Sequence, residues 1–533
     1  MFIICGIITM ANQQTEHLFQ LIKSLTKAEK RNFKLYATRG SNKEDKKFIQ
    51  LFDVLDKMHI YQEDYILQKI PEIKKVQLSN LKAHLYRQLL ISLRFNHSHL
   101  NIDIQIREQI DYARILYNKG LYQQSLKILD KAKNLARMAH KSIIQLEIVE
   151  FEKMIEGQYI TRSISNRAEL LTQEADELTR IIENTQDLSS LILQLYDMYI
   201  KAGLVKDEED YENVREFFFN QLPVEHFKEL SFYEKLYLYI AYSWYSHIIQ
   251  DFLMAYRYAQ KWVNLFHSEP IMLEQEPEWY LKGIHRLSEA LFNLQHYPKF
   301  VDTLVLMEDF EMTNAERGNE NIELLTFLYL STARINKYFM EGNFSQGKSL
   351  IPEILGKIEL YQGKLDTYHV LVLHYKIASL YFGSGEFSQA ITSLNHIINY
   401  KDTGLREDIH AFTRILNLIA HYEAGNHDIM DHQIRSVYHF LGKMNDLNPV
   451  HLEIFKFLRK LAKSPYFELK AEFLHLRDAL LQLRNKPYVK RPFLYFDIIS
   501  WLESKIENRS VQSVIHDKFV ALCKQYPRRF KKR

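Results

Sequence analysis

A short turn motif recurs along this chain, and it limits the fold more than any other feature of the sequence. Each clear copy has a glycine, an aromatic residue two positions later and a small residue three positions after that. The clear copies are NKGLYQQSLKILDKA with Gly120 and Tyr122, MEGNFSQGKSLIPEI with Gly342, Phe344 and Gly347, and GSGEFSQAITSLNHI with Gly385, Phe387 and Ala390. Glycine frees the backbone of a turn, and a small residue lets two helices approach closely. The motif therefore predicts hairpins of two helices.

Weaker copies of the motif keep its aromatic position and its helical spacing. They are marked by Tyr211, Phe252 and Tyr297, and by His427 in place of an aromatic residue. From Tyr211 onward, successive markers, including those of the clear copies, are 40 to 47 residues apart. The interval of 89 residues between Tyr122 and Tyr211 leaves room for one more hairpin, around residues 145–182. Such a near-constant period is typical of stacked helical repeats.

The motif resembles the turn and second helix of the tetratricopeptide repeat. In the best copy, Ala378 and Tyr381 also match the small and aromatic positions of that repeat's first helix. The resemblance covers residues 105–442, although the period is longer than the roughly 34 residues of that family. It implies an all-α fold, a right-handed α-solenoid of helix-turn-helix repeats with a helical cap at each end. The alternative is a non-repetitive bundle of unrelated helical hairpins.

Composition agrees with helices. The 533 residues include only 16 glycines and 11 prolines, so tight turns and phosphate-binding loops are scarce. Segments with helical periodicity recur, such as LYQQSLKILDKAKNLARMA, where Leu121, Leu126, Leu129 and Ala132 fall near one face. A chain of this length would ordinarily divide into several domains, whereas a solenoid grows by adding neighbours.

Four segments are expected from these patterns. They are residues 1–10, a basic N-terminal helical domain or cap over 11–100, the repeats over 101–445, and a basic C-terminal helical cap and tail over 446–533. In the first cap, Thr26 and Glu29 have the spacing of a capping box. The apolar run over residues 1–10 has two interpretations, an upstream mis-start before Met10 or a short apolar leader, and it is too short to span a bilayer.

The two cysteines, Cys5 and Cys523, lie at opposite ends of the chain and form no disulfide framework or zinc motif. We therefore expect a cytoplasmic protein without a membrane span. The net charge of +3 is uneven: residues 1–100 carry +7, residues 451–533 carry +11, and residues 101–450 carry −15. An acidic middle predicts preference for a basic partner, although contact between the ends and the middle, or solvated faces of unequal composition, would give the same pattern.

No short catalytic motif is present. The chain lacks a P-loop, G-x-G-x-x-G, H-E-x-x-H and G-x-S-x-G, so we predict neither an enzyme nor a cofactor. In HYEAGNHDIMDHQ, His427 and Asp431, and likewise Asp428 and His432, are four residues apart, as paired metal ligands on a helix require. Because the spacing supplies no third ligand, no metal site is predicted. His97 and His99 in NHSHL are expected to belong to a helix-end loop.

The leading functional hypothesis comes from the first helix of each hairpin. The tetratricopeptide resemblance turns certain positions of that helix toward the concave side: Tyr237, Trp244, Lys282, His285, Glu289, Tyr329, Asn336, Tyr375 and Phe382. Mixed rings and polar groups suit an extended peptide or a helix, although such rings also pack helices together. The family's paired Lys and Asn clamp is not reproduced, since Val372 stands at the position neighbouring Asn336. These positions predict a non-catalytic scaffold or adaptor for a protein or peptide.

The alternative hypothesis is a nucleic-acid-binding regulator. Residues 63–90 have the pattern of a short helix, a turn and a longer helix, which faintly resembles a helix-turn-helix. Its basic residues are Lys74, Lys75, Lys82 and Arg87, and the solenoid would then act as a sensor or oligomerisation arm. No strand-rich wing follows and the turn lacks glycine, so these residues also fit the solvated side of a cap helix.

Overall fold

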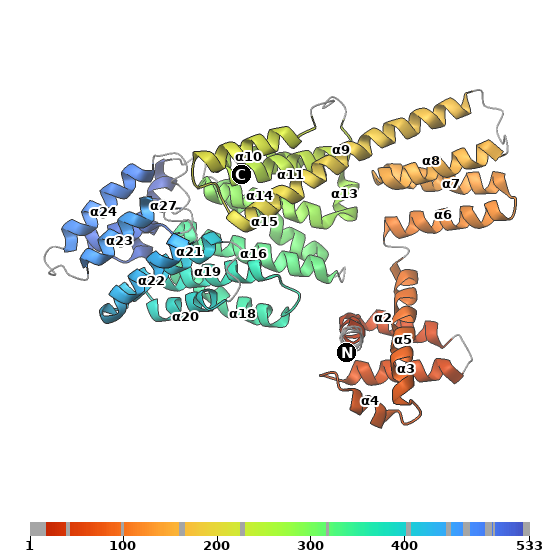
Figure 1. The fold of residues 1–533 in the computed structure, drawn as a ribbon, viewed down its shortest axis with the longest axis horizontal. Helices are drawn as coiled ribbons and strands as arrows, with labels where there is room; N and C mark the ends of the chain where they lie inside the picture. The colour runs from red at the N-terminus through yellow and green to blue at the C-terminus, as the bar shows by residue number, and fades with distance from the viewer. Residues whose placement is uncertain are drawn as a thin grey trace. The chain divides into compact units, whose positions relative to one another are not determined.

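The computed structural model describes residues 17–38, 43–97, 101–158, 166–223, 230–315, 319–400, 407–443, 449–461, 469–484, 493 and 496–525. Every regular element in these ranges is helical, and consecutive helices pack against their neighbours, which makes the protein an all-α solenoid (Figure 1). The chain forms two compact units, one ending at Leu178 and one beginning at Thr179. The apolar run over residues 1–10, His99 and the basic tail from Arg528 lie outside the described residues, and the expected segment boundaries stay predictions.

The first unit begins with a small helical bundle. Residues 17–24 are helical and are followed by α2 (Lys27–Ala37), α3 (Lys43–Lys57), α4 (Glu63–Lys69) and α5 (Lys75–His97). Leu18, Phe33, Phe52 and Leu85 are buried together in its core. The predicted capping box is confirmed: Glu29 N donates to Thr26 Oγ1, and Thr26 N donates to the Glu29 carboxylate at 2.8 Å.

The first unit continues with α6 (Ile102–Asn118), α7 (Tyr122–Met138), α8 (Ser142–Gln158) and the start of α9 (Arg167–Ala202). Leu126, Leu129 and Ala132 are buried on one face of α7, as expected. Leu121 is 40% exposed, so the prediction was wrong for it. The reason is that the helix begins only at Tyr122, and Leu121 precedes it in the turn.

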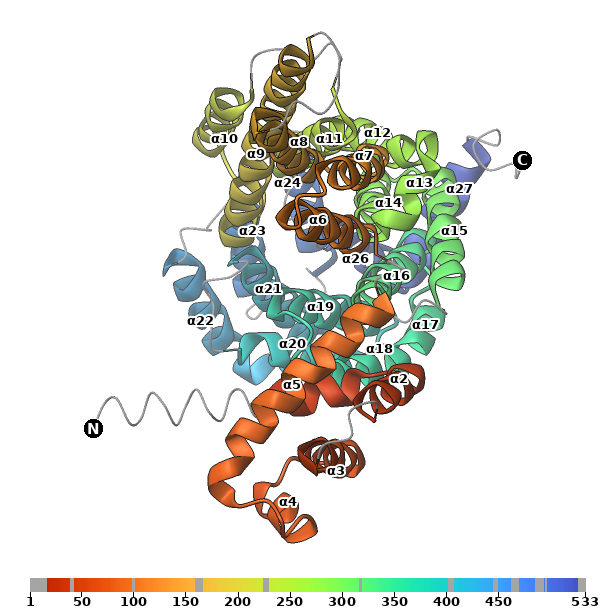
Figure 2. The same cartoon turned by 90° about the vertical axis from the view of Figure 1, so that its right-hand side faces the viewer.

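The second unit contains the rest of α9 and a succession of helix pairs. Its further helices are α10 (Glu208–Gln221), α11 (Phe232–Ile248), α12 (Phe252–Ser268), α13 (Pro270–Gln275), α14 (Pro277–Asn293), α15 (Tyr297–Asn314), α16 (Glu320–Glu341), α17 (Phe344–Gly347), α18 (Ile351–Leu360), α19 (Thr367–Gly383), α20 (Phe387–Ile398), α21 (Glu407–Glu423), α22 (Met430–Lys443), α23 (Pro449–Leu461), α24 (Leu469–Arg484), α26 (Ile498–Glu507) and α27 (Val511–Gln525). Figure 2 shows α11, α14, α16, α19 and α21 following one another along the inner side, with α12, α15 and α20 outside them.

The turns between paired helices have the geometry that the motif predicts. Gly342 and Gly385 take φ values of +67° and +84°, in the left-handed region that glycine adopts without strain. Two weaker copies keep this turn without glycine, since Gln250 and Gln295 also have positive φ, two residues before the markers Phe252 and Tyr297, and the His427 copy has Gly425 there with φ +76°. Tyr211 differs, because it lies within α10, which begins at Glu208.

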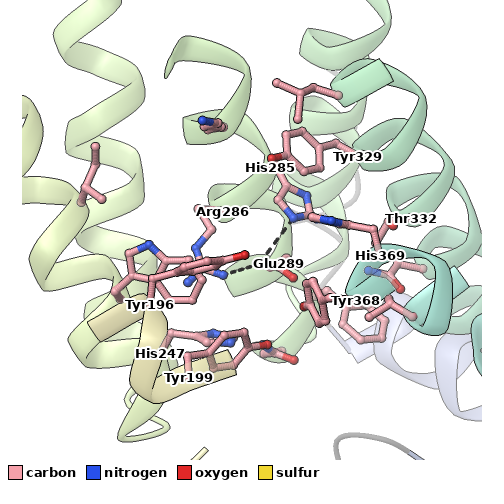
Figure 3. A pocket seen from close by; sticks show the side chains of 18 of the residues that line it. Tyr196, Tyr199, His247, His285, Arg286, Glu289, Tyr329, Thr332, Tyr368 and His369 are labelled. Carbon is pink, nitrogen blue, oxygen red and sulfur yellow. Dashed lines mark hydrogen bonds and ion pairs between the residues drawn. The ribbon is translucent and has the colours of Figure 1, made fainter. Parts of the chain in front are cut away.

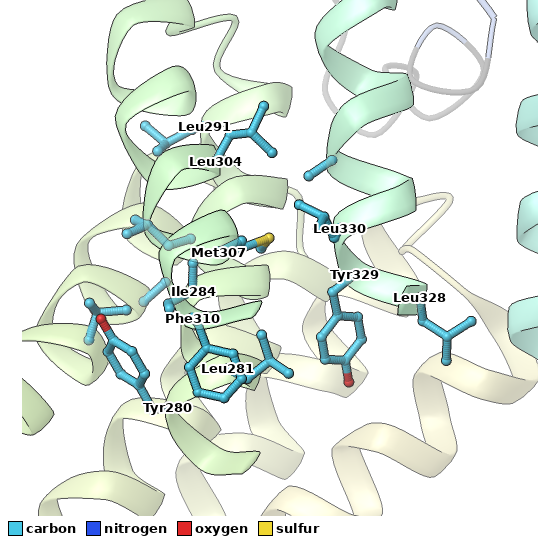
Figure 4. Close-up of a cluster of buried hydrophobic side chains, with 14 of the residues drawn as sticks. Tyr280, Leu281, Ile284, Leu291, Leu304, Met307, Phe310, Leu328, Tyr329 and Leu330 are labelled. Atoms are coloured by element: carbon cyan, nitrogen blue, oxygen red, sulfur yellow. The ribbon is translucent and has the colours of Figure 1, made fainter. Parts of the chain in front are cut away.

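Small residues in the motif allow close helix packing. A Cβ atom added to Gly347 would lie 2.6 Å from Leu380 Cδ2, so α17 approaches α19 more closely than a larger residue would permit. Between α14, α15 and α16, apolar side chains pack together, among them Leu281, Ile284, Met307 and Leu330 (Figure 4). Burial of such side chains contributes about 1.5–3 kcal/mol each, which is why successive repeats hold together.

The C-terminal helix returns to the middle of the solenoid. Gln512 Oε1 on α27 accepts a hydrogen bond from Ser345 N at 2.8 Å, and His516 Nδ1 lies 2.9 Å from the Glu341 carbonyl oxygen. Phe519 meets the ring of Tyr297 edge to face, with centroids 4.8 Å apart. Helix α27 therefore docks on the turn between α16 and α17. None of the helices in the described ranges combines the length and apolar composition needed to cross a membrane.

Candidate functional site

The inner side of the second unit encloses a cavity of about 690 Å³. Its walls come from α9, α11, α14, α16 and α19, with Ile409 of α21. Seven of the nine predicted groove residues line it: Trp244, Lys282, His285, Glu289, Tyr329, Asn336 and Tyr375. Side chains spaced along the inner helices thus converge on one cavity (Figure 3).

The other two predicted groove residues are not among the residues that line the cavity. Tyr237 lies two helical turns before Trp244 on α11 and packs its ring against Trp279, with centroids 5.8 Å apart. Phe382 is 2% exposed and lies between the rings of Phe387 and Phe496. Their rings pack helices together, which was the alternative role that the sequence left open.

Glu289 forms the centre of a charged cluster on α14. Its Oε2 atom lies 2.6 Å from Arg286 Nη1 and 3.7 Å from His285 Nε2. Burial acts to raise the pKa of Glu289, but this effect is outweighed by Arg286 and by His285, which is charged only at acidic pH, so the pKa lies below its ordinary value. The Arg286 guanidinium also lies over the Trp244 ring, 3.6 Å from its centroid. Glu289 is therefore ionised and paired with Arg286.

His285 is held in a wall between two repeats. Its ring stacks on that of Tyr329 from α16, with centroids 4.0 Å apart. Burial lowers the pKa of His285 to about 4, even though Glu289 acts to raise it. The ring is therefore neutral at neutral pH and contributes a flat surface to the cavity.

Two lysines in the lining have no carboxylate within ion-pair distance among the described residues. Lys376 Nζ donates to Asn336 Oδ1 at 2.6 Å, and burial lowers the pKa of Lys376 to about 8, against the raising effect of Glu289. Lys282 Nζ lies 4.6 Å from the centroid of the Trp279 ring, and burial lowers its pKa as well. Both residues line the cavity, and the carboxylates that act on them, Glu278 on Lys282 and Glu289 on Lys376, lie beyond ion-pair distance.

Asn336 has a lysine partner that the sequence did not indicate. The prediction that the family's Lys and Asn clamp is not reproduced concerned position 372, which is Val372, and it stays a prediction. In the structure the partner is Lys376, one helical turn further along α19, because the stagger between α16 and α19 brings that turn level with Asn336. Lys376 stands four residues after Val372 in the sequence.

Sequence reasoning also missed the wall that α9 contributes. Tyr196 and Tyr199 lie against Trp244, with ring centroids 5.3 Å and 5.1 Å apart. Leu193 and Ser189 of the same helix complete this wall. The marker Tyr211 follows α9, but the predicted groove begins only with the hairpin of the next marker, Phe252.

The basic residues of the nucleic-acid hypothesis lie in the N-terminal bundle. Lys82 Nζ on α5 donates to Tyr61 Oη at 3.1 Å and lies 3.5 Å from Glu63 Oε2, so it is engaged within the bundle. Lys74, Lys75 and Arg87 are exposed. No contact in the described residues favours nucleic acid, and that function stays a prediction.

In the part of the chain that the structure describes, no three His, Cys, Asp or Glu side chains gather as a metal site would require. No protein-family model matches this chain, and no curated protein matches it either. The all-α solenoid is therefore shown by the structure itself, and the function has to be inferred from the geometry of the cavity.

Proposed function

We propose that this protein is a non-catalytic interaction scaffold of the tetratricopeptide-like kind, which holds a segment of a protein or peptide partner in the cavity of its second unit. The observation that carries the proposal is the convergence of rings and polar groups from successive inner helices on one concave site. Concave sites of about 300–1,000 Å³ with apolar walls and a few polar groups are typical of ligand binding. We propose a cytoplasmic location, because the cysteine usage is that of a chain without structural disulfides.

An extended segment leaves its backbone N–H and C=O groups free for the polar side chains of the cavity, whereas a helix pairs most of these groups internally. We therefore propose that the cavity takes a short extended segment or the end of a chain.

Tryptophan fluorescence offers a direct test. Three of the four tryptophans, Trp244, Trp262 and Trp279, line the cavity, whereas Trp501 lies on α26. A ligand that enters the cavity should change the emission of the purified protein. We would screen a library of random-sequence peptides for such changes and then measure the affinity of each positive peptide.

A matched pair of variants shows where those peptides bind. Thr332 lines the cavity, whereas Thr392 is exposed on α20 and is absent from the lining. Thr332→Phe should weaken peptide binding at least tenfold because the ring fills the cavity, and Thr392→Phe should leave it unchanged. Equal binding by both variants, or a library without a single binder, would refute the proposed function.

A further inference from the structure

We propose that the cavity recognises an anionic group of its ligand, a carboxylate or a phosphate, attached to an aromatic or apolar group. The inference rests on the proposed function, since it names the ligand chemistry of the same cavity. It differs from the preference for basic partners that the acidic residues 101–450 predict, because the charges that line the cavity have the opposite sign.

The side chains that line the cavity carry more positive than negative charge. Its cationic side chains are Lys282, Arg286 and Lys376, and Glu289 is the one carboxylate among the lining residues. Arg286 is already paired with Glu289 at 2.6 Å. The two lysines have no carboxylate within ion-pair distance among the described residues, so their positive charge attracts an anion in surroundings where solvent screening is weak.

The ammonium group of Lys376 is buried at a cost in free energy. Burying an ammonium group without a counter-charge is costly, and this cost is the reason that burial lowers the Lys376 pKa. An ammonium group has three N–H donors, of which Asn336 Oδ1 accepts one. An anion beside Lys376 would accept another and would supply the missing counter-charge.

The cationic side chains of the lining are donors only, since the ammonium groups of Lys282 and Lys376 and the guanidinium of Arg286 carry N–H groups and no acceptor. A complementary ligand therefore has to bring acceptors, as carboxylate and phosphate groups do.

The aromatic side chains of the lining indicate the rest of the ligand. Rings of Tyr196, Tyr199, Trp244, Tyr329 and Tyr368 form much of the wall beside the charged cluster (Figure 3). Aromatic walls bind flat or apolar groups through contact area and edge or face packing. The ligand group that accompanies the anion should therefore be aromatic or apolar.

Four small probes of similar size separate these requirements. They are 3-phenylpropionate, phenyl phosphate, the neutral 3-phenylpropanamide and the cationic phenethylammonium, measured by tryptophan emission and by ligand-observed NMR. We expect the two anions to bind at least tenfold more tightly than the amide and the cation. The tighter anion identifies the source of the charge, carboxylate or phosphate. Equal or tighter binding of the amide or the cation would overturn the inference.

Variants that are expected to change the affinity in opposite directions distinguish a specific effect on binding from misfolding. Lys376→Met and Lys282→Met should weaken 3-phenylpropionate binding, and Lys376→Arg should retain it. Glu289→Gln should strengthen binding, because it releases Arg286 for the anion, and structural damage would not produce a gain. Lys261→Met is the matched control, since Lys261 is exposed on α12 and lies over the Tyr258 ring at 4.8 Å, away from the cavity lining.

The outcomes also separate this inference from the proposed function. Library peptides that bind in the cavity, but keep their affinity in Lys376→Met and Glu289→Gln, would leave the scaffold function standing and overturn anion recognition. Anion recognition is overturned in the same way if peptides bind while none of the four probes does. If neither the library peptides nor the four probes bind to the unmodified protein, both proposals are overturned.

Discussion

The imidazole of His285 stacks face to face on the phenol ring of Tyr329, with an interplanar angle of 7°. The two residues belong to α14 and α16, so this contact joins neighbouring inner helices in the wall of the cavity. Tyr329 is buried as well, which raises the pKa of its phenol above the ordinary value. Both rings are therefore uncharged at neutral pH, and they hold the wall by packing.

The buried state of His285 predicts a pH dependence of stability. Burial lowers its pKa from 6.5 to about 4 in the folded protein, so between these pH values the unfolded chain binds a proton that the folded chain does not. The free energy of unfolding should therefore fall as pH decreases from 6.5 toward 4. Urea denaturation at pH 7 and pH 5 should show a smaller loss for His285→Gln than for the unmodified protein. His59→Gln, at an exposed position, should behave as the unmodified protein does.

Anion affinity should depend on the protonation of Lys376. Its pKa of about 8 means that the ammonium charge is lost as pH rises through that value. The affinity for 3-phenylpropionate should fall between pH 7 and pH 9.5 and should be halved near pH 8, because the loss of affinity follows the deprotonation of the free protein. Lys376→Arg should flatten this profile, since arginine stays protonated. A profile that is flat in the unmodified protein would contradict the assignment of Lys376 to the anion.

The small residue of the turn motif should be essential for packing. A Cβ atom at position 347 would lie 2.6 Å from Leu380 Cδ2, so Gly347→Ala should destabilise the protein by roughly 1–3 kcal/mol through overpacking. The control is Gly356→Ala in α18, where a Cβ atom meets nothing within 4 Å. That change should stabilise by about 0.5–1 kcal/mol, as removal of glycine from a helix does. Thermal denaturation measures both, and a loss of equal size in each would contradict the packing role.

Gly342 should control the docking of the C-terminal helix. Gly342 and Gly385 both have left-handed φ, so alanine at either position costs about 1–2 kcal/mol. Only at Gly342 would the added Cβ atom also collide with the backbone of α27, at His516, whereas at Gly385 it meets nothing within 4 Å. Hydrogen exchange of residues 511–525 should therefore accelerate in Gly342→Ala and stay unchanged in Gly385→Ala. Equal exchange in the two variants would show that α27 is held elsewhere.

The helical hairpins followed from local chemistry. Gly120, Gly342 and Gly385 are left-handed because the turn needs that conformation, and a sequence shows glycine directly. Gln250 and Gln295 adopt the same conformation without any such signal in the sequence, so only the spacing of Phe252 and Tyr297 revealed their turns. Helical periodicity likewise places Trp244, His285 and Tyr329 on the inner faces of their helices, since 3.6 residues per turn is a property of each helix alone.

The sequence by itself thus determined the all-α helical hairpins and seven of the residues that line the cavity. The tertiary structure alone decided how neighbouring helices are staggered, and this stagger pairs Asn336 with Lys376, a partner that the sequence did not indicate. It also decided that α9 closes one wall and that His516 reaches Glu341, 175 residues away. The physical reason is that periodicity and turn conformation are local, whereas contacts between distant segments, and the uncompensated charge they enclose, depend on how whole surfaces fit together.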